Sequence, residues 1–174
     1  YSCSTPEVEK LNFDFFGEKF KDIQVLRYQI PGFDELTLKQ KKLVYFLTEA
    51  GLAGRDIMYD QNYRHNLSIR RALEKIYSNY DGDKKSEEWL NFEIYLKRIW
   101  FANGIHHHYS NDKFDPNFSS EYLNYLLSET ETELNKEAFK VIFNDKDSKK
   151  VNRDQTKGLV IGSAVNFYGE DVKE

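Results

Sequence analysis

The pattern of apolar and polar positions predicts a mainly α-helical chain. Apolar residues recur at helical spacing, and each such stretch is bounded by capping or turn residues. Short extended segments are expected near residues 22–30, where apolar and polar residues alternate, and near 158–167, where apolar residues run together. The helical stretches cover residues 37–58, 66–80, 86–102, 119–127 and 130–143.

The first helix is expected to begin at Thr37, because Thr37 and Gln40 have the spacing of a capping box,. Its apolar residues form one stripe. Two glycines lie inside it, and each weakens a helix by about 1 kcal/mol relative to alanine while allowing a neighbouring helix to approach closely. The stripe consists of Leu43, Phe46, Leu47, Ala50, Ala53, Ile57 and Met58, and the glycines are Gly51 and Gly54.

Other helix boundaries follow from the same signals. Asn103 and Gly104 form a helix stop, and Thr130 with Glu133 has the spacing of a second capping box, which predicts a helix from there to Phe143,. Trp89 and Trp100 fall on one helical face and are interpreted as core residues,. Residues 144–154 are polar and charged, which indicates a surface loop.

The domain organisation is expected to be simple. Residues 1–15 are interpreted as a flexible N-terminal segment, and residues 16–174 as a single, mainly helical domain. The stretch 169–174 has the composition of a helix start, so we expect this domain to be incomplete,.

Composition and charge narrow the function classes. The chain has 25 basic and 29 acidic residues and a net charge of −4, which gives no attraction to nucleic acid,. No apolar run approaches the ~20 residues that span a bilayer. The single cysteine, Cys3, follows small residues and resembles the lipid-bearing cysteine of a bacterial lipoprotein, although Tyr1 and Ser2 should then have been removed,. The alternative is an exposed free thiol.

The most suggestive chemistry lies in the run His106-His107-His108. In an extended segment, His106 and His108 would point the same way and could chelate one metal ion, with Asp112 as a third ligand,. Adjacent histidines in a polar loop are more often hydrogen-bonded or solvated. The sequence contains no His-Glu-x-x-His zinc motif and no Gly-x-Ser-x-Gly nucleophile motif,.

Several long strings resemble a known enzyme family. They are Asp22-Ile-Gln-Val-Leu-Arg-Tyr-Gln-Ile-Pro-Gly-Phe33, Leu38-Lys-Gln-Lys41, Gly54-Arg-Asp-Ile57, Asp60-Gln-Asn62, residues 95–109, Lys113-Phe114-x-Pro116 and residues 163–168. Together they span about residues 16–172 in order. The chain resembles the N-terminal portion of a bacterial, Bacteroides-type dipeptidyl-peptidase III, a family of zinc metallopeptidases.

The resemblance implies a two-lobed exopeptidase that releases dipeptides from peptide N-termini. In that family a His-Glu-x-x-x-His helix and a further Glu hold the zinc in the other lobe, and none of these elements occurs in this chain. The implied cofactor is therefore zinc in the full-length protein, with none bound by this chain. Residues 1–174 are expected to build part of the substrate cleft and to be inactive alone.

The resemblance also points to one loop. Tyr109 matches an aromatic residue near the second residue of the substrate, and the surrounding substrate-binding frame matches Asn103, Gly104, Lys113, Phe114 and Pro116. The expected partners are short peptides and the rest of the peptidase chain, with self-association of the fragment. The expected location is periplasmic or membrane-anchored if Cys3 is lipidated, and otherwise cytoplasmic.

Two other functions stay open from the residues themselves. One is a stand-alone helical lipoprotein that uses the aromatic loop to hold a peptide or partner. The other is a metal-binding protein that uses His106 and His108.

Overall fold

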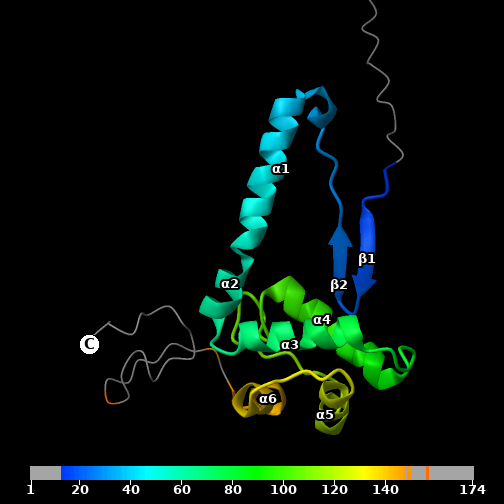
Figure 1. The fold of residues 1–174 in the computed structure, drawn as a ribbon, viewed down its shortest axis with the longest axis vertical. Coiled ribbons are helices and arrows are strands. Elements are labelled where there is room, and N and C mark those ends of the chain that lie inside the picture. The colour runs from blue at the N-terminus through cyan, green and yellow to red at the C-terminus, as the bar shows by residue number, and fades with distance from the viewer. Residues whose placement is uncertain (1–12, 148, 150–155, 157–174) are drawn as a thin grey trace, which may run out of the picture. The chain divides into compact units, whose positions relative to one another are not determined.

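The structure is a computed structural model that describes residues 13–147, 149 and 156. It is mainly helical, as the sequence predicts (Figure 1). The strands are β1 (Phe16–Phe20) and β2 (Ile23–Leu26), followed by a 3-10 turn at Phe33–Glu35. The helices are α1 (Leu38–Ala53), α2 (Arg55–Asn62), α3 (Asn66–Asn79), α4 (Glu87–Ala102), α5 (Ser120–Glu129) and α6 (Lys136–Phe143).

By compactness the chain divides into two units, residues 1–42 and residues 43–174. The first unit contains an antiparallel hairpin of β1 and β2, in which Phe20 pairs with Ile23 across a two-residue turn. Lys21 takes a left-handed conformation (φ 50°) in that turn. The predicted extended segment at 22–30 is therefore regular only over β2, and the expected segment at 158–167 lies outside the described residues.

The second unit is organised around α3, which packs against α2, α4 and α6 (Figure 1). Its core is rich in aromatic rings. Trp89 of α4 stacks on Tyr80, with ring centroids 4.6 Å apart, and lies parallel to Tyr77 at 6.0 Å. Burial of such large rings removes much apolar surface from water, so a small number of helices can form a stable core. Trp100 shares the face of Trp89 but is 38% exposed, so only one tryptophan lies in the core.

Helix caps agree with the sequence at several positions. The backbone amide of Thr37 donates to Oε1 of Gln40 at 2.9 Å, and the amide of Gln40 contacts the Thr37 hydroxyl at 3.4 Å, which confirms the capping box,. Ser86 and Ser119 cap α4 and α5 through their hydroxyls. Asn103 ends α4 in the left-handed conformation, with φ 54°,.

Two predicted helices differ from the observed ones. The first ends at Ala53, and α2 begins after a turn at Gly54, because two nearby glycines favour a break,. The helix predicted from Thr130 begins instead at Lys136, where the Asn135 side chain accepts a hydrogen bond from the amide of Ala138 at 2.7 Å. The prediction of a capping box at Thr130 and Glu133 is therefore wrong.

The reason is visible at Thr130 itself. Its hydroxyl lies 2.7 Å from the carbonyl of Leu126 and 2.8 Å from the hydroxyl of Thr132, so it is engaged in the end of α5. Glu131 then takes a left-handed conformation, with φ 47°. A helix cannot continue through that residue.

Candidate functional site

The candidate site is the loop that follows α4, from Asn103 to Pro116. It begins with a close approach between Gly104 and the buried side chain of Asn66. Asn66 donates to the carbonyl of Asn103 at 3.3 Å and accepts from the amide of Ile105 at 3.1 Å. A Cβ on Gly104 would lie 2.2 Å from Nδ2 of Asn66, and Gly104 has φ 152°. Glycine is therefore required here for space and for conformation.

The loop then folds back on itself as a short irregular hairpin. His106 and Lys113 form an antiparallel bridge. The amide of Phe114 donates to the carbonyl of Ile105 at 2.8 Å, and the amide of His107 donates to the carbonyl of Asp112 at 2.7 Å. These bonds fix the base of the loop and leave residues 107–112 as its tip.

The tip presents aromatic rings to solvent. Tyr109 is 90% exposed. Its ring lies 4.1 Å from the ring of His108, which in turn lies 4.5 Å from His107 and 5.7 Å from Phe101. Such a stack offers a flat, partly polar surface on which an apolar side chain or a peptide group can pack.

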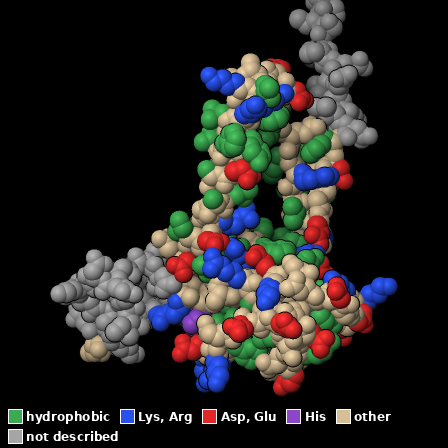
Figure 2. All heavy atoms as spheres, in the orientation of Figure 1, with side chains coloured by type: hydrophobic (Ala, Val, Ile, Leu, Met, Phe, Trp, Pro, Cys, Tyr) green, Lys and Arg blue, Asp and Glu red, His purple; other side chains and the backbone are tan. Residues whose placement is uncertain are grey.

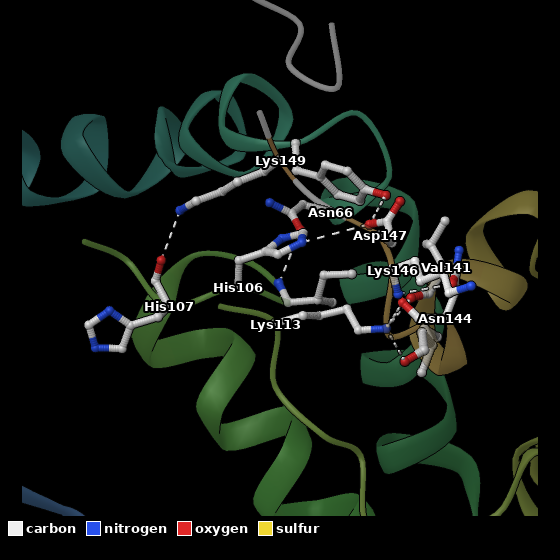
Figure 3. Close-up of polar contacts among 12 residues, drawn as sticks. Asn66, His106, His107, Lys113, Val141, Asn144, Lys146, Asp147 and Lys149 are labelled. Atoms are coloured by element: carbon white, nitrogen blue, oxygen red, sulfur yellow. Dashed lines mark hydrogen bonds and ion pairs between the residues drawn. The ribbon is translucent and has the colours of Figure 1, made fainter. Parts of the chain in front are cut away.

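The base of the loop holds a buried histidine (Figure 3). His106 is 2% exposed, and its ring meets the ring of Tyr63 edge-on at 4.8 Å. Its Nε2 lies 3.7 Å from Oδ2 of Asp147, too far for a hydrogen bond,. Burial, together with the charges of Lys149 and Lys113, lowers the pKa of His106 to about 4, so the imidazole is neutral at pH 7,.

Asp147, in the segment that follows α6, contacts the base of the loop. Its carboxylate accepts a hydrogen bond of 2.5 Å from the phenol of Tyr63 (Figure 3). Burial is the largest cause that raises the pKa of Tyr63, and the bond to Asp147 adds to it, so the phenol keeps its proton. Nearby, the ammonium group of Lys149 donates to the carbonyl of His107 at 2.8 Å.

Lys113 forms a second contact between the loop and the C-terminal end of α6. Its Nζ lies 2.8 Å from the carbonyl of Val141, 3.0 Å from that of Ile142 and 2.6 Å from that of Asn144 (Figure 3). These carbonyls belong to the C-terminal end of α6, where backbone acceptors lack helical partners and the helix dipole favours a cation. Burial lowers the pKa of Lys113.

A hollow of about 450 Å³ lies beside this base, lined by residues 111–116 together with Asp145 and Asp147. Four aspartates line it, and the one lysine among its residues has its ammonium group on the α6 carbonyls. The hollow is therefore acidic, and it favours a cationic group over an anionic one.

The structure divides the predicted site residues into two groups. Tyr109 projects into solvent, whereas Asn103, Gly104, Lys113 and Phe114 shape the loop from within. Phe114 is 7% exposed, and the guanidinium carbon of Arg98 lies 4.5 Å from its ring centroid. Pro116 lines the acidic hollow.

The histidines separate in the same way. His106 lies in the core beside Asp147, whereas His108 belongs to the exposed stack on Tyr109. Over the described residues, no group of three or more His, Cys, Asp or Glu side chains is placed to hold a metal ion. Cys3 lies outside the described range.

Sequence reasoning missed the residues that hold the loop in place. Asn66 and Tyr63 lie far from the loop along the chain, and their sequence context resembles that of ordinary helix-end residues. Asp147 belongs to the stretch expected to be a surface loop, yet its side chain is 18% exposed and hydrogen-bonded to Tyr63. No local signal in the sequence marks such long-range partners.

Within the described part of the chain, no helix is both long enough and apolar enough to cross a membrane. Comparison with protein-family models found no match for the chain, and comparison with curated proteins found none either.

Proposed function

We propose that this chain is the N-terminal part of a zinc-dependent dipeptidyl peptidase and that it supplies part of the substrate cleft. The proposal rests on the resemblance to dipeptidyl-peptidase III over residues 16–172 and on the geometry of one loop. It includes short peptides as substrates and the rest of the peptidase chain as the structural partner.

The observation that carries the proposal is the exposed ring of Tyr109 on a firmly held loop. The ring is 90% exposed, while the base of the same loop is fixed by Asn66 and Lys113. A Tyr ring has an apolar face and a polar hydroxyl, so a ring held in solvent by a fixed loop can pack against a peptide and also form a hydrogen bond. A fixed base also lets the contact form with little loss of conformational entropy.

The acidic hollow adds a second, weaker support. A peptide substrate of an exopeptidase carries a free ammonium group at its N-terminus. Asp112, Asp115, Asp145 and Asp147 around the hollow produce a field that attracts such a group,.

Zinc does not fit the described residues of this chain. His106 is buried beside Asp147, and among the described residues neither the half-buried His107 nor the exposed His108 belongs to a group of three side chains that could hold a metal ion. We therefore assign zinc and the chemical step to the part of the peptidase outside residues 1–174. The chain alone is proposed to be inactive.

The test uses the complete gene product that contains residues 1–174 and a dipeptidyl arylamide substrate. We expect chelator-sensitive release of the dipeptide, and a Tyr109→Ala variant with KM raised at least five-fold and kcat changed less. Tyr125→Ala is the control, because Tyr125 is also exposed but lies on α5. Cleavage by residues 1–174 alone, or cleavage that resists chelation, would contradict the proposal.

A second candidate is a stand-alone helical binding module, a lipoprotein if Cys3 carries a lipid. The buried core that α3 forms with α2, α4 and α6 favours it, because these helices pack against one another within the described residues. A downstream His-Glu-x-x-x-His in the same reading frame would decide for the peptidase. A lipoprotein signal before Cys3 and a stop after Glu174 would decide for the module. For either candidate, the proposed location is periplasmic or membrane-anchored if Cys3 is lipidated, and cytoplasmic otherwise.

A further inference from the structure

Asn66 is a buried polar residue whose side chain contacts residues outside its own helix. It is the first residue of α3, and it is 2% exposed. Its backbone amide bonds to the carbonyl of Tyr63 at 2.9 Å, a contact that needs no side chain. Asparagine also has a lower helix propensity than alanine. The asparagine at this position therefore serves a contact other than the formation of α3.

That contact is with the backbone on both sides of Gly104. The side-chain amide of Asn66 donates to the carbonyl of Asn103 at 3.3 Å and accepts from the amide of Ile105 at 3.1 Å (Figure 3). An amide side chain supplies a donor and an acceptor together, whereas an ionised aspartate supplies acceptors alone. A Cβ on Gly104 would lie 2.2–2.7 Å from three atoms of the Asn66 side chain. Asn66 therefore holds residues 103–105 in one closely fitted conformation.

Residues 103–105 are the entrance to the loop. The chain leaves α4 through two residues with positive φ, Asn103 at 54° and Gly104 at 152°. Ile105 follows, fully buried, and its carbonyl accepts from the amide of Phe114 at 2.8 Å. Because the two arms of the loop are paired at this point, the place of Ile105 determines where the tip, residues 107–112, projects.

The exit of the loop is held by different contacts. Lys113 binds carbonyls at the C-terminal end of α6, and Lys149 donates to the carbonyl of His107. Tyr109 lies between the entrance and the exit, and its ring contacts the rings of His107 and His108 within the tip. Loss of the Asn66 side chain would therefore leave the entrance free to move about the contacts at the exit.

The position of the Tyr109 ring matters because ring contacts act over a short range. Their attraction is lost when a gap of an ångström opens between the surfaces. On the face that Figure 2 shows, Lys and Arg side chains are interspersed with Asp and Glu side chains, so no wide field of one sign orients a ligand on that face,. A peptide at the tip would therefore depend on where the ring is held.

We infer that Asn66 is a positioning residue for the Tyr109 ring: from α3 it fixes residues 103–105 and, through them, the place of the ring. The consequence for binding rests on the proposed function, which takes the ring as a peptide contact. The positioning itself is a property of the fold, so it can be measured without a peptide.

The first experiment measures the mobility of the tip by NMR relaxation on residues 1–174. In Asn66→Ala we expect the amide order parameters of residues 107–112 to fall by about 0.2 and the contact between the rings of Tyr109 and His108 to weaken. Ile76→Val is the control, because Ile76 is fully buried on the same helix but lies ten residues further on. It should leave the tip unchanged. Asn66→Asp keeps the shape and the acceptor for Ile105, and it replaces Asn66→Ala if that variant does not fold.

The second experiment measures peptide affinity in a double-mutant cycle. The ligand is a tetrapeptide with a free N-terminus, and the chains are wild type, Asn66→Ala, Tyr109→Ala and the double variant, all at a temperature where each is folded. We expect Asn66→Ala to raise Kd at least about three-fold alone and less than about 1.5-fold in the Tyr109→Ala background. A purely structural role would leave Kd of the folded chain unchanged, as we expect for Ile76→Val.

The two experiments separate this inference from the proposed function. Unchanged order parameters in Asn66→Ala would overturn the inference, whatever the peptide does. An equal rise in Kd in both backgrounds would also overturn it, because Asn66 would then act by a route other than Tyr109. A wild-type chain that binds no peptide, with a tip that loosens in Asn66→Ala, would contradict the proposed function and still support Asn66 as the positioning residue.

Discussion

The phenol of Tyr63 donates a 2.5 Å hydrogen bond to the carboxylate of Asp147, across 84 residues of sequence. This bond holds the chain that follows α6 against the start of α3. The same carboxylate faces the buried imidazole of His106 at 3.7 Å. The pair therefore closes the base of the loop that carries Tyr109.

Removal of the Tyr63 hydroxyl should destabilise the fold measurably. Tyr63→Phe leaves the Asp147 carboxylate without its donor, and hydrogen bonds to charged groups contribute about 1.5–3 kcal/mol. Tyr59→Phe is the matched control, since Tyr59 is equally buried but its hydroxyl lies 3.5 Å from the carbonyl of Trp100. In urea unfolding we expect a loss of roughly 2 kcal/mol for Tyr63→Phe and under about 1 kcal/mol for Tyr59→Phe. Equal losses would contradict the role given to Asp147.

Gly104 should not tolerate a side chain. Gly104→Ala would place a Cβ 2.2 Å from the Asn66 amide, at a backbone conformation that alanine rarely adopts. We expect a loss of more than about 2 kcal/mol in thermal unfolding. Gly51→Ala, in open space on α1, should instead be neutral or stabilising by up to about 1 kcal/mol,. A mild effect of Gly104→Ala would show that the loop can rearrange around Asn66.

Lys113 should contribute more to stability than other surface lysines. Lys113→Met removes the donor that satisfies three carbonyls at the end of α6. We expect a loss of about 2–3 kcal/mol in urea unfolding. Lys75→Met is the control, because Lys75 is exposed and donates to a single carbonyl, that of Glu131. Its loss should stay below about 1 kcal/mol. Similar losses of stability for both variants would contradict the structural role given to Lys113.

The fold should lose stability in mild acid through His106. In the unfolded chain a histidine takes up a proton near pH 6.5, whereas the folded His106 does so only near pH 4. The unfolded state therefore binds more protons between these values, and stability falls as the pH drops from 6.5 towards 4. The loss should be on the order of 2–3 kcal/mol, at about 1.4 kcal/mol per unit of pKa.

His106→Gln should flatten this dependence. His65, whose pKa is also lowered by burial, acts in the same direction, so His65→Gln gives the comparison for a second histidine. Urea unfolding at pH 7, 6 and 5 measures the difference between wild type and each variant. An unchanged slope in His106→Gln would show that His106 is not the group that titrates.

The sequence predicts local features of the fold better than long-range ones. The helix that begins after Ser86 and ends at Asn103 could be predicted, because the cap, the apolar spacing and the stop all lie within it. The helix expected at Thr130 fails because the Thr130 hydroxyl is taken by Leu126 and Thr132, a choice that spacing does not reveal. Local sequence signals show which hydrogen bonds a side chain could form, whereas tertiary packing determines which of them it forms.

The same limit applies to the site. The resemblance in its immediate neighbourhood points to Tyr109, and the structure places its ring in solvent at the tip of the loop. Asn66, Tyr63 and Asp147 reach the loop from other elements, so no pattern near Asn103–Pro116 could identify them. The spacing of two residues makes His106 and His108 equivalent in an extended segment, but of the two only His106 is buried in the core.

The central claim, that Tyr109 and its loop contact peptide, can be measured directly on residues 1–174. The measurement is an NMR titration of the labelled chain with a tetrapeptide that has a free N-terminus, compared with its N-acetylated form. We predict saturable shifts at residues 103–116 and at Asp145 and Asp147, which also line the acidic hollow. Both Tyr109→Ala and acetylation of the peptide should weaken the binding at least five-fold. Shifts that are absent from this loop, or that persist unchanged in Tyr109→Ala, would contradict the claim.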